Sequence, residues 1–220
     1  MNKLRLRFSK TGRAKYISHL DLMRTFQRAF LRADLAVKQT EGFNPHAYLS
    51  IALPLQLGCE SRCEILDTVL TDEMPFSAIP ERLNPFLPDG INVLKAFQPV
   101  KKPKEIKFLQ FISNLVYDGG VNEQLAQMLK SFFASGNITI MKKTKKGEDE
   151  VNLAPHIFRA DVYCKDNRTL VLDALVSAQN PTVNPPHLIA ALKALPEAPI
   201  PSFSMDSRVE IFDQTMTVFS

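Results

Sequence analysis

The sequence has 220 residues, of which 45% are hydrophobic and 23% charged, the composition of a globular protein with one large or two small domains. This excludes a disordered or fibrous chain. No run of eighteen uncharged apolar residues occurs, and the N-terminus alternates charged residues with leucine instead of forming the apolar core of a signal peptide. We therefore expect a soluble, cytoplasmic protein with no membrane partner.

The charge is concentrated in the N-terminal fifth of the chain. The net charge is +4, but residues 1–46 carry ten Lys or Arg and three acidic residues, a surplus of +7. Such a segment focuses positive potential, which attracts a polyanion such as RNA or an anionic face of a partner protein. A solvated basic face remains an alternative. A second basic run, at 142–146, is followed at once by acidic residues and predicts a solvated hairpin tip.

The first half of the chain predicts the order strand, helix, two strands, helix, strand. Leu4, Leu6 and Phe8 alternate with charged residues, which predicts a strand over 3–9. Ser18 and Asp21 match a capping-box variant at the start of a helix whose apolar residues recur at three- and four-residue steps to about residue 33. The remaining predicted elements are a short extended piece at 35–38, strands at 48–53, 64–70 and 91–97, and a helix at 76–86.

The same order recurs after a proline-bracketed linker at 99–104. The predicted strands lie at 108–117, 138–141, 158–164, 169–176 and 208–212, and the helices at 121–133 and 187–195. Two landmarks also recur: Pro45-His46 as Pro155-His156, and the five-residue spacing of Arg62 and Asp67 as that of Arg168 and Asp173. Chance could produce either match alone.

The repeated order predicts an α+β fold made of two tandem ferredoxin-like (split βαβ) domains with antiparallel sheets. The first domain is expected at 1–100, and it carries the basic helix. The second is expected at 104–220 as a diverged duplicate of the first. In each domain both helices would cover one face of the sheet.

The first predicted helix carries arginines at Arg24, Arg28 and Arg32, four residues apart, with Gln27 beside them. This spacing stacks them along one stripe. Guanidinium groups bind phosphates bidentately and stack on bases, so the stripe suits an RNA backbone. Pairing with nearby acids, or simple solvation, is the alternative. Lys10, Arg13, Lys15 and Tyr16 precede the helix and would extend the patch.

The one enzyme-like constellation consists of His19, Asp21 and His46. His19 lies at a helix N-terminus, where it could donate to a phosphate or act as a general acid or base, and His46 follows a turn-forming cluster that contains Phe43 and Asn44. A loop aromatic residue such as Phe43 could stack on a base or fill a hydrophobic gap. The alternative roles are helix capping for Asp21 and an ordinary first-turn position for His19. The predicted nucleic-acid-binding residues are Lys10, Arg13, Lys15, Tyr16, His19, Arg24, Gln27, Arg28, Arg32, Phe43, Asn44 and His46, with His19 and His46 also the candidate catalytic residues.

Signatures of cofactor and metal chemistry are missing from the sequence. It contains no phosphate-binding glycine loop, no dinucleotide-binding turn and no nucleophile elbow. Cys59 and Cys63 have no companion pair that would complete a zinc or iron–sulfur site, and with Cys164 the three cysteines are expected to be reduced thiols. Asp67 is expected to pair with Arg62 or with the arginine stripe. We therefore expect no cofactor and no metal.

Several runs of the sequence resemble one bacterial family. They are Tyr16-Ile17-Ser18-His19-Leu20-Asp21-Leu22-Met23-Arg24, then Gly42-Phe43-Asn44-Pro45-His46, Leu53-Pro54-Leu55, Gly58 and Leu66-Asp67. This pattern, which covers residues 3 to about 100 well and the second half loosely, resembles the radical-SAM-linked family, a domain of unknown function. Its members occur alone or joined to the C-terminal end of a B12-binding radical SAM protein, often beside genes for ribonuclease and ribosomal proteins. The resemblance implies an accessory role near RNA metabolism or a radical SAM enzyme.

Three hypotheses follow. The first is a non-catalytic module that binds structured RNA, tRNA or rRNA rather than DNA, and delivers it to a B12-binding radical SAM protein for modification. The second is an RNA-processing or RNA-modifying enzyme that uses His19 and His46 as acid and base. The third is a protein-only adaptor whose arginines bind an acidic face of the radical SAM partner.

Overall fold

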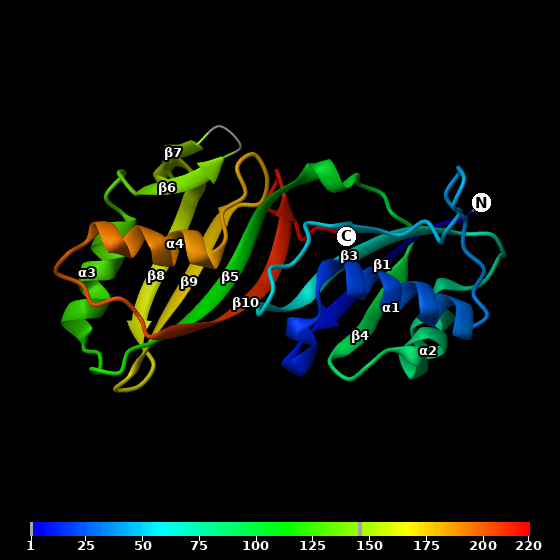
Figure 1. The fold of residues 1–220 in the computed structure, drawn as a ribbon, viewed down its shortest axis with the longest axis horizontal. Coiled ribbons are helices and arrows are strands. Elements are labelled where there is room, and N and C mark those ends of the chain that lie inside the picture. The colour runs from blue at the N-terminus through cyan, green and yellow to red at the C-terminus, as the bar shows by residue number, and fades with distance from the viewer. Residues whose placement is uncertain (1, 145–146) are drawn as a thin grey trace. The chain divides into compact units, whose positions relative to one another are not determined.

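The computed structural model describes residues 2–144 and 147–220. The chain folds into two compact units (Figure 1). The first comprises Met1–Glu105 with Phe219–Ser220, and the second comprises Ile106–Val218. Both mix helices with antiparallel strands, so the expected α+β class is confirmed. Among the described residues, no helix is long and apolar enough to span a membrane.

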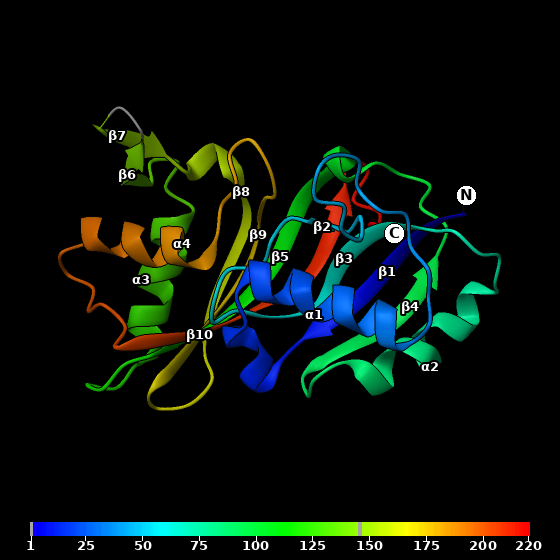
Figure 2. The same ribbon diagram turned by 45° about the vertical axis from the view of Figure 1, so that its right-hand side comes forward.

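The first unit places two helices on one antiparallel sheet. Its elements are β1 (Asn2–Lys10), α1 (His19–Arg32), β2 (Ser50–Ala52), β3 (Glu60–Leu70), α2 (Ile79–Leu83) and β4 (Ile91–Phe97). The strand order is β4-β1-β3-β2, and every neighbouring pair is antiparallel. Figure 2 shows the short β2 beside β3. The sequence therefore predicted each of these elements, although β2 is shorter than the predicted 48–53.

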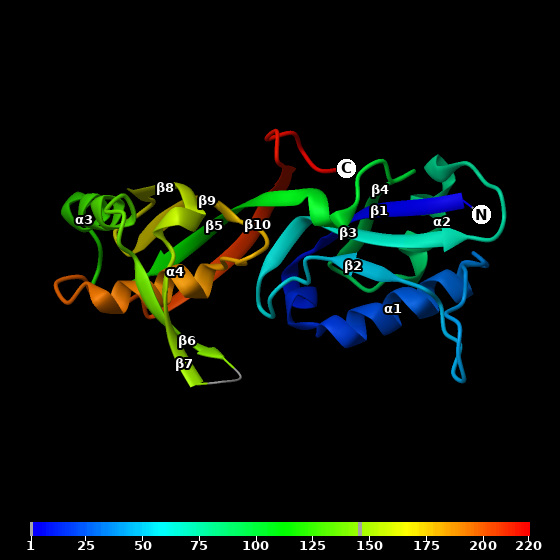
Figure 3. The same ribbon diagram turned by 90° about the horizontal axis from the view of Figure 1, so that it is seen from above.

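The core of the first unit forms between α1, α2 and the β1 face that carries Leu4, Leu6 and Phe8. Phe26 of α1 packs edge-on against Phe8, with ring centroids 4.9 Å apart. Burying a side chain of this size stabilises the fold by about 1.5–3 kcal/mol. The helix α1 lies against one face of the sheet (Figure 3). Its buried residues are Leu22, Phe26, Ala29 and Phe30, whereas its arginines lie on the exposed surface.

The second unit has the strand order β10-β5-β9-β8, again antiparallel throughout. Its elements are β5 (Ile106–Val116), α3 (Glu123–Phe133), β6 (Thr139–Thr144), β7 (Gly147–Asn152), β8 (Ile157–Cys164), β9 (Thr169–Ser177), α4 (Pro185–Ala191) and β10 (Phe203–Asp213). The hairpin β6–β7 was predicted only in part, as one strand at 138–141, because residues 142–150 contain no apolar residue and show no alternation. Lys145 and Lys146, part of the predicted hairpin tip, lie outside the described residues.

A buried ion pair joins β1 to β3 in the first unit. Arg5 is 1% exposed and donates from Nε and Nη2 to the two carboxylate oxygens of Asp67, at 2.6 and 2.7 Å. Its third nitrogen, Nη1, donates to the Ser220 carbonyl at 3.2 Å, and the guanidinium lies 4.8 Å from the centre of the Phe219 ring. Asp67 therefore pairs with Arg5, and the expectation that it pairs with Arg62 or with the arginine stripe is corrected.

Candidate nucleic-acid interface

The N-terminus of α1 is fixed by a capping network. The Ser18 hydroxyl accepts a hydrogen bond from the Asp21 backbone N–H at 3.2 Å and donates to the Asp21 carboxylate at 2.7 Å. That carboxylate also accepts from Arg24 Nη1 at 3.1 Å. The hydrogen bonds from Ser18 and Arg24 hold the pKa of Asp21 below its ordinary value. Asp21 therefore acts in capping, and it partly neutralises Arg24.

The loop that carries His46 is closed by its own hydrogen bonds. The Thr40 backbone N–H donates to the His46 carbonyl at 2.8 Å, and the His46 backbone N–H donates to the Thr40 hydroxyl at 3.1 Å. His46 Nδ1 lies 3.1 Å from both the Thr40 hydroxyl and the Asn44 carbonyl oxygen. With Nδ1 protonated and bound to that carbonyl, Nε2 is left as an acceptor. Phe43, at the tip of the loop, is fully exposed.

A groove of about 380 Å³ lies between α1 and this loop, and we call it the helix–loop groove. Its lining residues are His19, Leu20, Met23, Arg24, Gln27, Thr40, Asn44, His46, Ala47 and Leu49. Five of the predicted site residues are thus brought together from two separate segments. Methionine and leucine side chains give the groove an apolar wall, while imidazole, guanidinium and amide groups supply hydrogen-bond donors and acceptors.

Lys10 does not belong to the exposed surface on which the sequence placed it. It is 1% exposed, and its Nζ donates to the backbone carbonyls of Ile17 at 2.7 Å and Lys15 at 3.3 Å. Burial lowers the pKa of this ammonium, although the charges of Glu64 and Cys59 act in the opposite direction. Lys10 therefore anchors the 3₁₀ turn Gly12–Tyr16 that leads into α1.

The other residues predicted before α1 lie at the surface. Arg13 is exposed, and Tyr16 is 66% exposed. Lys15 is half-buried; its Nζ lies 3.7 Å from the Glu60 carboxylate and 5.4 Å from the centre of the Tyr16 ring. Since Glu60 partly neutralises Lys15, Arg13 and Tyr16 are the more accessible members of this group.

Arg28 and Arg32 lie nearer the C-terminal end of α1 than Arg24 and do not line the helix–loop groove. Together with Thr25 and residues 85–88 they line a second groove of about 440 Å³, which we call the Arg28–Phe86 groove. Within the described part of the chain neither arginine has an ion pair or hydrogen bond through its side chain. The sequence did not point to Phe86, because its segment was predicted as the end of a helix. The signal that could have found it is an aromatic residue in a Pro-Phe-Leu-Pro run.

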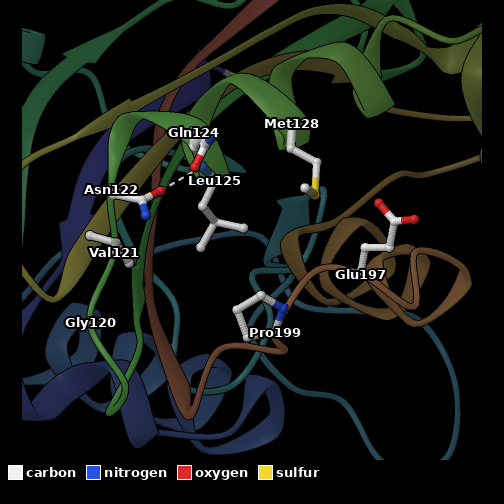
Figure 4. A pocket seen from close by; sticks show the side chains of 8 residues that line it. All are labelled: Gly120, Val121, Asn122, Gln124, Leu125, Met128, Glu197 and Pro199. Carbon is white, nitrogen blue, oxygen red and sulfur yellow. Dashed lines mark hydrogen bonds between the residues drawn. The ribbon is translucent and has the colours of Figure 1, made fainter.

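A pocket of about 350 Å³ in the second unit contains none of the predicted site residues. Figure 4 shows it at the start of α3, where the Asn122 side chain accepts a hydrogen bond from the Leu125 backbone N–H at 2.9 Å. Met128, Pro199 and the acidic Glu197 also line it. With a carboxylate and no cation in its lining, this pocket does not suit a polyanion.

No metal site is visible in the parts that the structure describes. Within residues 2–144 and 147–220, no group of three or more His, Cys, Asp or Glu side chains is arranged to hold a metal ion. Cys59 and Cys63 are buried and form no disulfide within the described residues, and Cys164 is half-buried.

The fold and the grooves define an α+β protein with arginines and histidines gathered around one helix. The chain belongs to a family of uncharacterized proteins conserved in bacteria (DUF2344), which matches residues 3–185 and so extends well into the second unit. No curated protein matches. A solved structure described as that of an unknown protein from Galdieria sulphuraria is similar over 89% of this chain and 92% of its own, with 9% sequence identity and a TM-score of 0.29.

Proposed function

We propose that this protein is an accessory RNA-binding module, specific for tRNA or rRNA, that works with a B12-binding radical SAM enzyme in RNA modification. The observation that carries the RNA part is the helix–loop groove. It gathers His19, Arg24, Gln27, Asn44 and His46 beside the fully exposed ring of Phe43. The radical SAM part rests on the resemblance of the sequence to the radical-SAM-linked family.

The groove combines the features that single-stranded RNA requires. Arg24 and His19, in the first two turns of α1, would bind a phosphate near the positive end of the helix. Phe43 would provide a flat ring on which a base stacks, and Gln27 and Asn44 would bind base edges that are unpaired in a loop or bulge.

We also propose that the two units are tandem ferredoxin-like domains. The orders β4-β1-β3-β2 and β10-β5-β9-β8 are equivalent when β5, β8, β9 and β10 correspond to β1, β2, β3 and β4. Asp67 on β3 accepts hydrogen bonds from Arg5 of β1, and Asp173 on β9 accepts a hydrogen bond from Gln110 of β5 at 2.8 Å. Both contacts join the first strand of a unit to its third, although Asp67 lies directly opposite Arg5 while Asp173 lies opposite Ile112. The strand order is therefore the main support for a duplication.

RNA binding is tested by fluorescence anisotropy with total tRNA and rRNA fragments over a salt series. Arg24→Gln is the informative variant, because it removes the charge without placing a second carboxylate beside Asp21. We expect tight binding at low salt and a log–log salt slope that falls by about 0.7–0.9 in the variant. Lys193→Gln, which removes one exposed charge from the second unit, is the matched control and should leave the slope unchanged. A folded protein that binds neither RNA at low salt refutes the proposal.

An enzymatic role is the second candidate, because His19 and His46 line the same groove and Nδ1 of His46 is held by the loop. This arrangement would suit acid–base chemistry on a bound RNA. The test is His19→Ala and His46→Ala with each RNA that binds. Retained affinity with loss of RNA cleavage or modification would support an enzyme, whereas no turnover by the wild-type protein would contradict it.

A further inference from the structure

The three arginines of α1 do not lie on a straight line. An α-helix turns about 100° per residue, so each four-residue step advances about 6 Å along the axis and about 40° around it. Arg24 consequently lines the helix–loop groove, whereas Arg28 and Arg32 line the Arg28–Phe86 groove. The row of guanidinium groups therefore passes over the exposed side of α1 from one groove to the other.

The charges at the second groove are available for a ligand. Asp21 partly neutralises Arg24, and Arg82 of the neighbouring α2 donates to the backbone carbonyls of Ala33 and Asp34. Arg28 and Arg32 have no such partner among the residues that the structure describes. The helix dipole favours a cation at Arg32, in the last turn, but it does not account for Arg28 in the middle of the helix.

An aromatic ring, that of Phe86, lines the same groove as these arginines. Phe86 is 41% exposed and ends the 3₁₀ turn Asn84–Phe86. The Asn84 side chain holds this turn to β4, since it accepts from the Val93 N–H at 2.7 Å and donates to the Val93 carbonyl at 3.1 Å. Pro85 and Pro88 further restrict the backbone. A ring that is ordered before binding can stack on a base at low entropic cost.

We infer that the Arg28–Phe86 groove is a second nucleotide subsite, and that one RNA strand crosses α1 from the helix–loop groove to reach it. A base stacks on Phe86, and Arg28 and Arg32 bind the adjoining phosphates. Cations that follow the backbone, combined with an aromatic platform, are the features by which proteins bind single-stranded nucleic acid. This inference rests on the proposed function, but it adds a site and a direction for the strand.

A length series of single-stranded RNA tests the inference. Oligonucleotides of two to ten residues are titrated against wild-type protein, Phe86→Leu, Phe86→Tyr and the double variant Arg28→Gln, Arg32→Gln. We expect Phe86→Leu to weaken the long oligonucleotides roughly 5- to 150-fold and to leave the shortest ones unchanged, because these fill only the helix–loop groove. Phe86→Tyr should retain wild-type affinity, which separates stacking from folding. Phe203→Leu, which makes the same change at a phenylalanine of the second unit that is 54% exposed, is the control.

The outcomes separate the two proposals. If Arg24→Gln weakens every length while the Phe86 and Arg28/Arg32 variants weaken none, the second subsite is refuted and the RNA-binding role stands. If no RNA binds, the RNA-binding role itself fails. If the double arginine variant leaves RNA affinity unchanged but loses binding to an oligoglutamate peptide, the groove takes an acidic protein segment, and this also overturns the inference.

Discussion

The substitution Asp67→Asn is expected to destabilise the first unit strongly. Arg5 is 1% exposed, and both oxygens of the Asp67 carboxylate accept its hydrogen bonds, at 2.6 and 2.7 Å. An asparagine keeps one acceptor oxygen but removes the Asp67 charge that faces the buried guanidinium. Removing one partner of a buried ion pair typically costs about 3–5 kcal/mol of unfolding free energy, and the lower half of this range applies here because the Asp67 side chain is 20% exposed.

The size of this loss makes it easy to measure. A domain is typically stable by about 5–15 kcal/mol, so the substitution removes a large fraction of the total. With a urea dependence of about 2 kcal/mol/M, the unfolding midpoint should fall by about 2 M, as followed by circular dichroism. The double variant Arg5→Met, Asp67→Leu should lie closer to wild type, because it removes both charges and fills the space with apolar atoms.

A midpoint for Asp67→Asn within about 0.5 M of wild type would refute this reasoning, since it corresponds to about 1 kcal/mol. It would mean that the remaining contacts of Arg5, with the Ser220 carbonyl and the Phe219 ring, compensate the buried charge without a carboxylate. If the double variant Arg5→Met, Asp67→Leu were less stable than Asp67→Asn, this would contradict the expectation that apolar side chains can replace the ion pair.

Three further substitutions test local features. The hydroxyl of Tyr117 is buried without a partner among the described residues, and burial raises the pKa of Tyr117 to about 12. The tyrosine therefore ionises at a lower pH in the unfolded chain than in the folded protein. Through this group the wild type should lose about 1.4 kcal/mol of unfolding free energy between pH 8 and 11. Tyr117→Phe should abolish this loss and be neutral or stabilising at pH 8; an unchanged pH dependence of the urea midpoint would contradict the assignment. Ser18→Ala should lower the free energy of unfolding by about 1 kcal/mol, because it removes the N-terminal cap of α1. An unaltered melting temperature would argue against this capping role. Gly90→Ala should lower the free energy of unfolding by at least about 1 kcal/mol, because φ is +85° and the new Cβ would lie 2.2 Å from the Thr11 carbonyl oxygen. Gly119→Ala is the control, since its Cβ would enter open space, and it should lower the melting temperature less.

The regular elements were predictable because their residue patterns have simple physical causes. The alternation of Leu4, Leu6 and Phe8 places three side chains on one face of β1, and all three are fully buried. The capping signal of Ser18 and Asp21 located the start of α1 to within a residue. The hairpin β6–β7 was predicted only in part, because its charged residues show no periodicity in the sequence.

The candidate site was predictable by residue type but only partly by position. Residues of α1 share a face through helical geometry, whereas the approach of His46 depends on the hydrogen bonds that it makes with Thr40, six positions earlier. Such contacts between loop residues leave no periodic signal in the sequence. Phe86 was missed for a related reason, since its exposure depends on how Asn84 attaches the turn to β4.

Lys10 shows why loss of binding in a variant does not by itself place a residue at the interface. Its Nζ holds the carbonyls of Lys15 and Ile17, so Lys10→Met should disturb the turn before α1 and the position of His19. Because the ammonium is buried and touches no phosphate, we expect the affinity for RNA to fall while the salt slope stays at the wild-type value. Arg24→Gln, in contrast, should lower both the affinity for RNA and the salt slope. A salt slope that falls by about 0.7 in Lys10→Met would instead show that this lysine reaches the RNA, and that the turn opens when RNA binds.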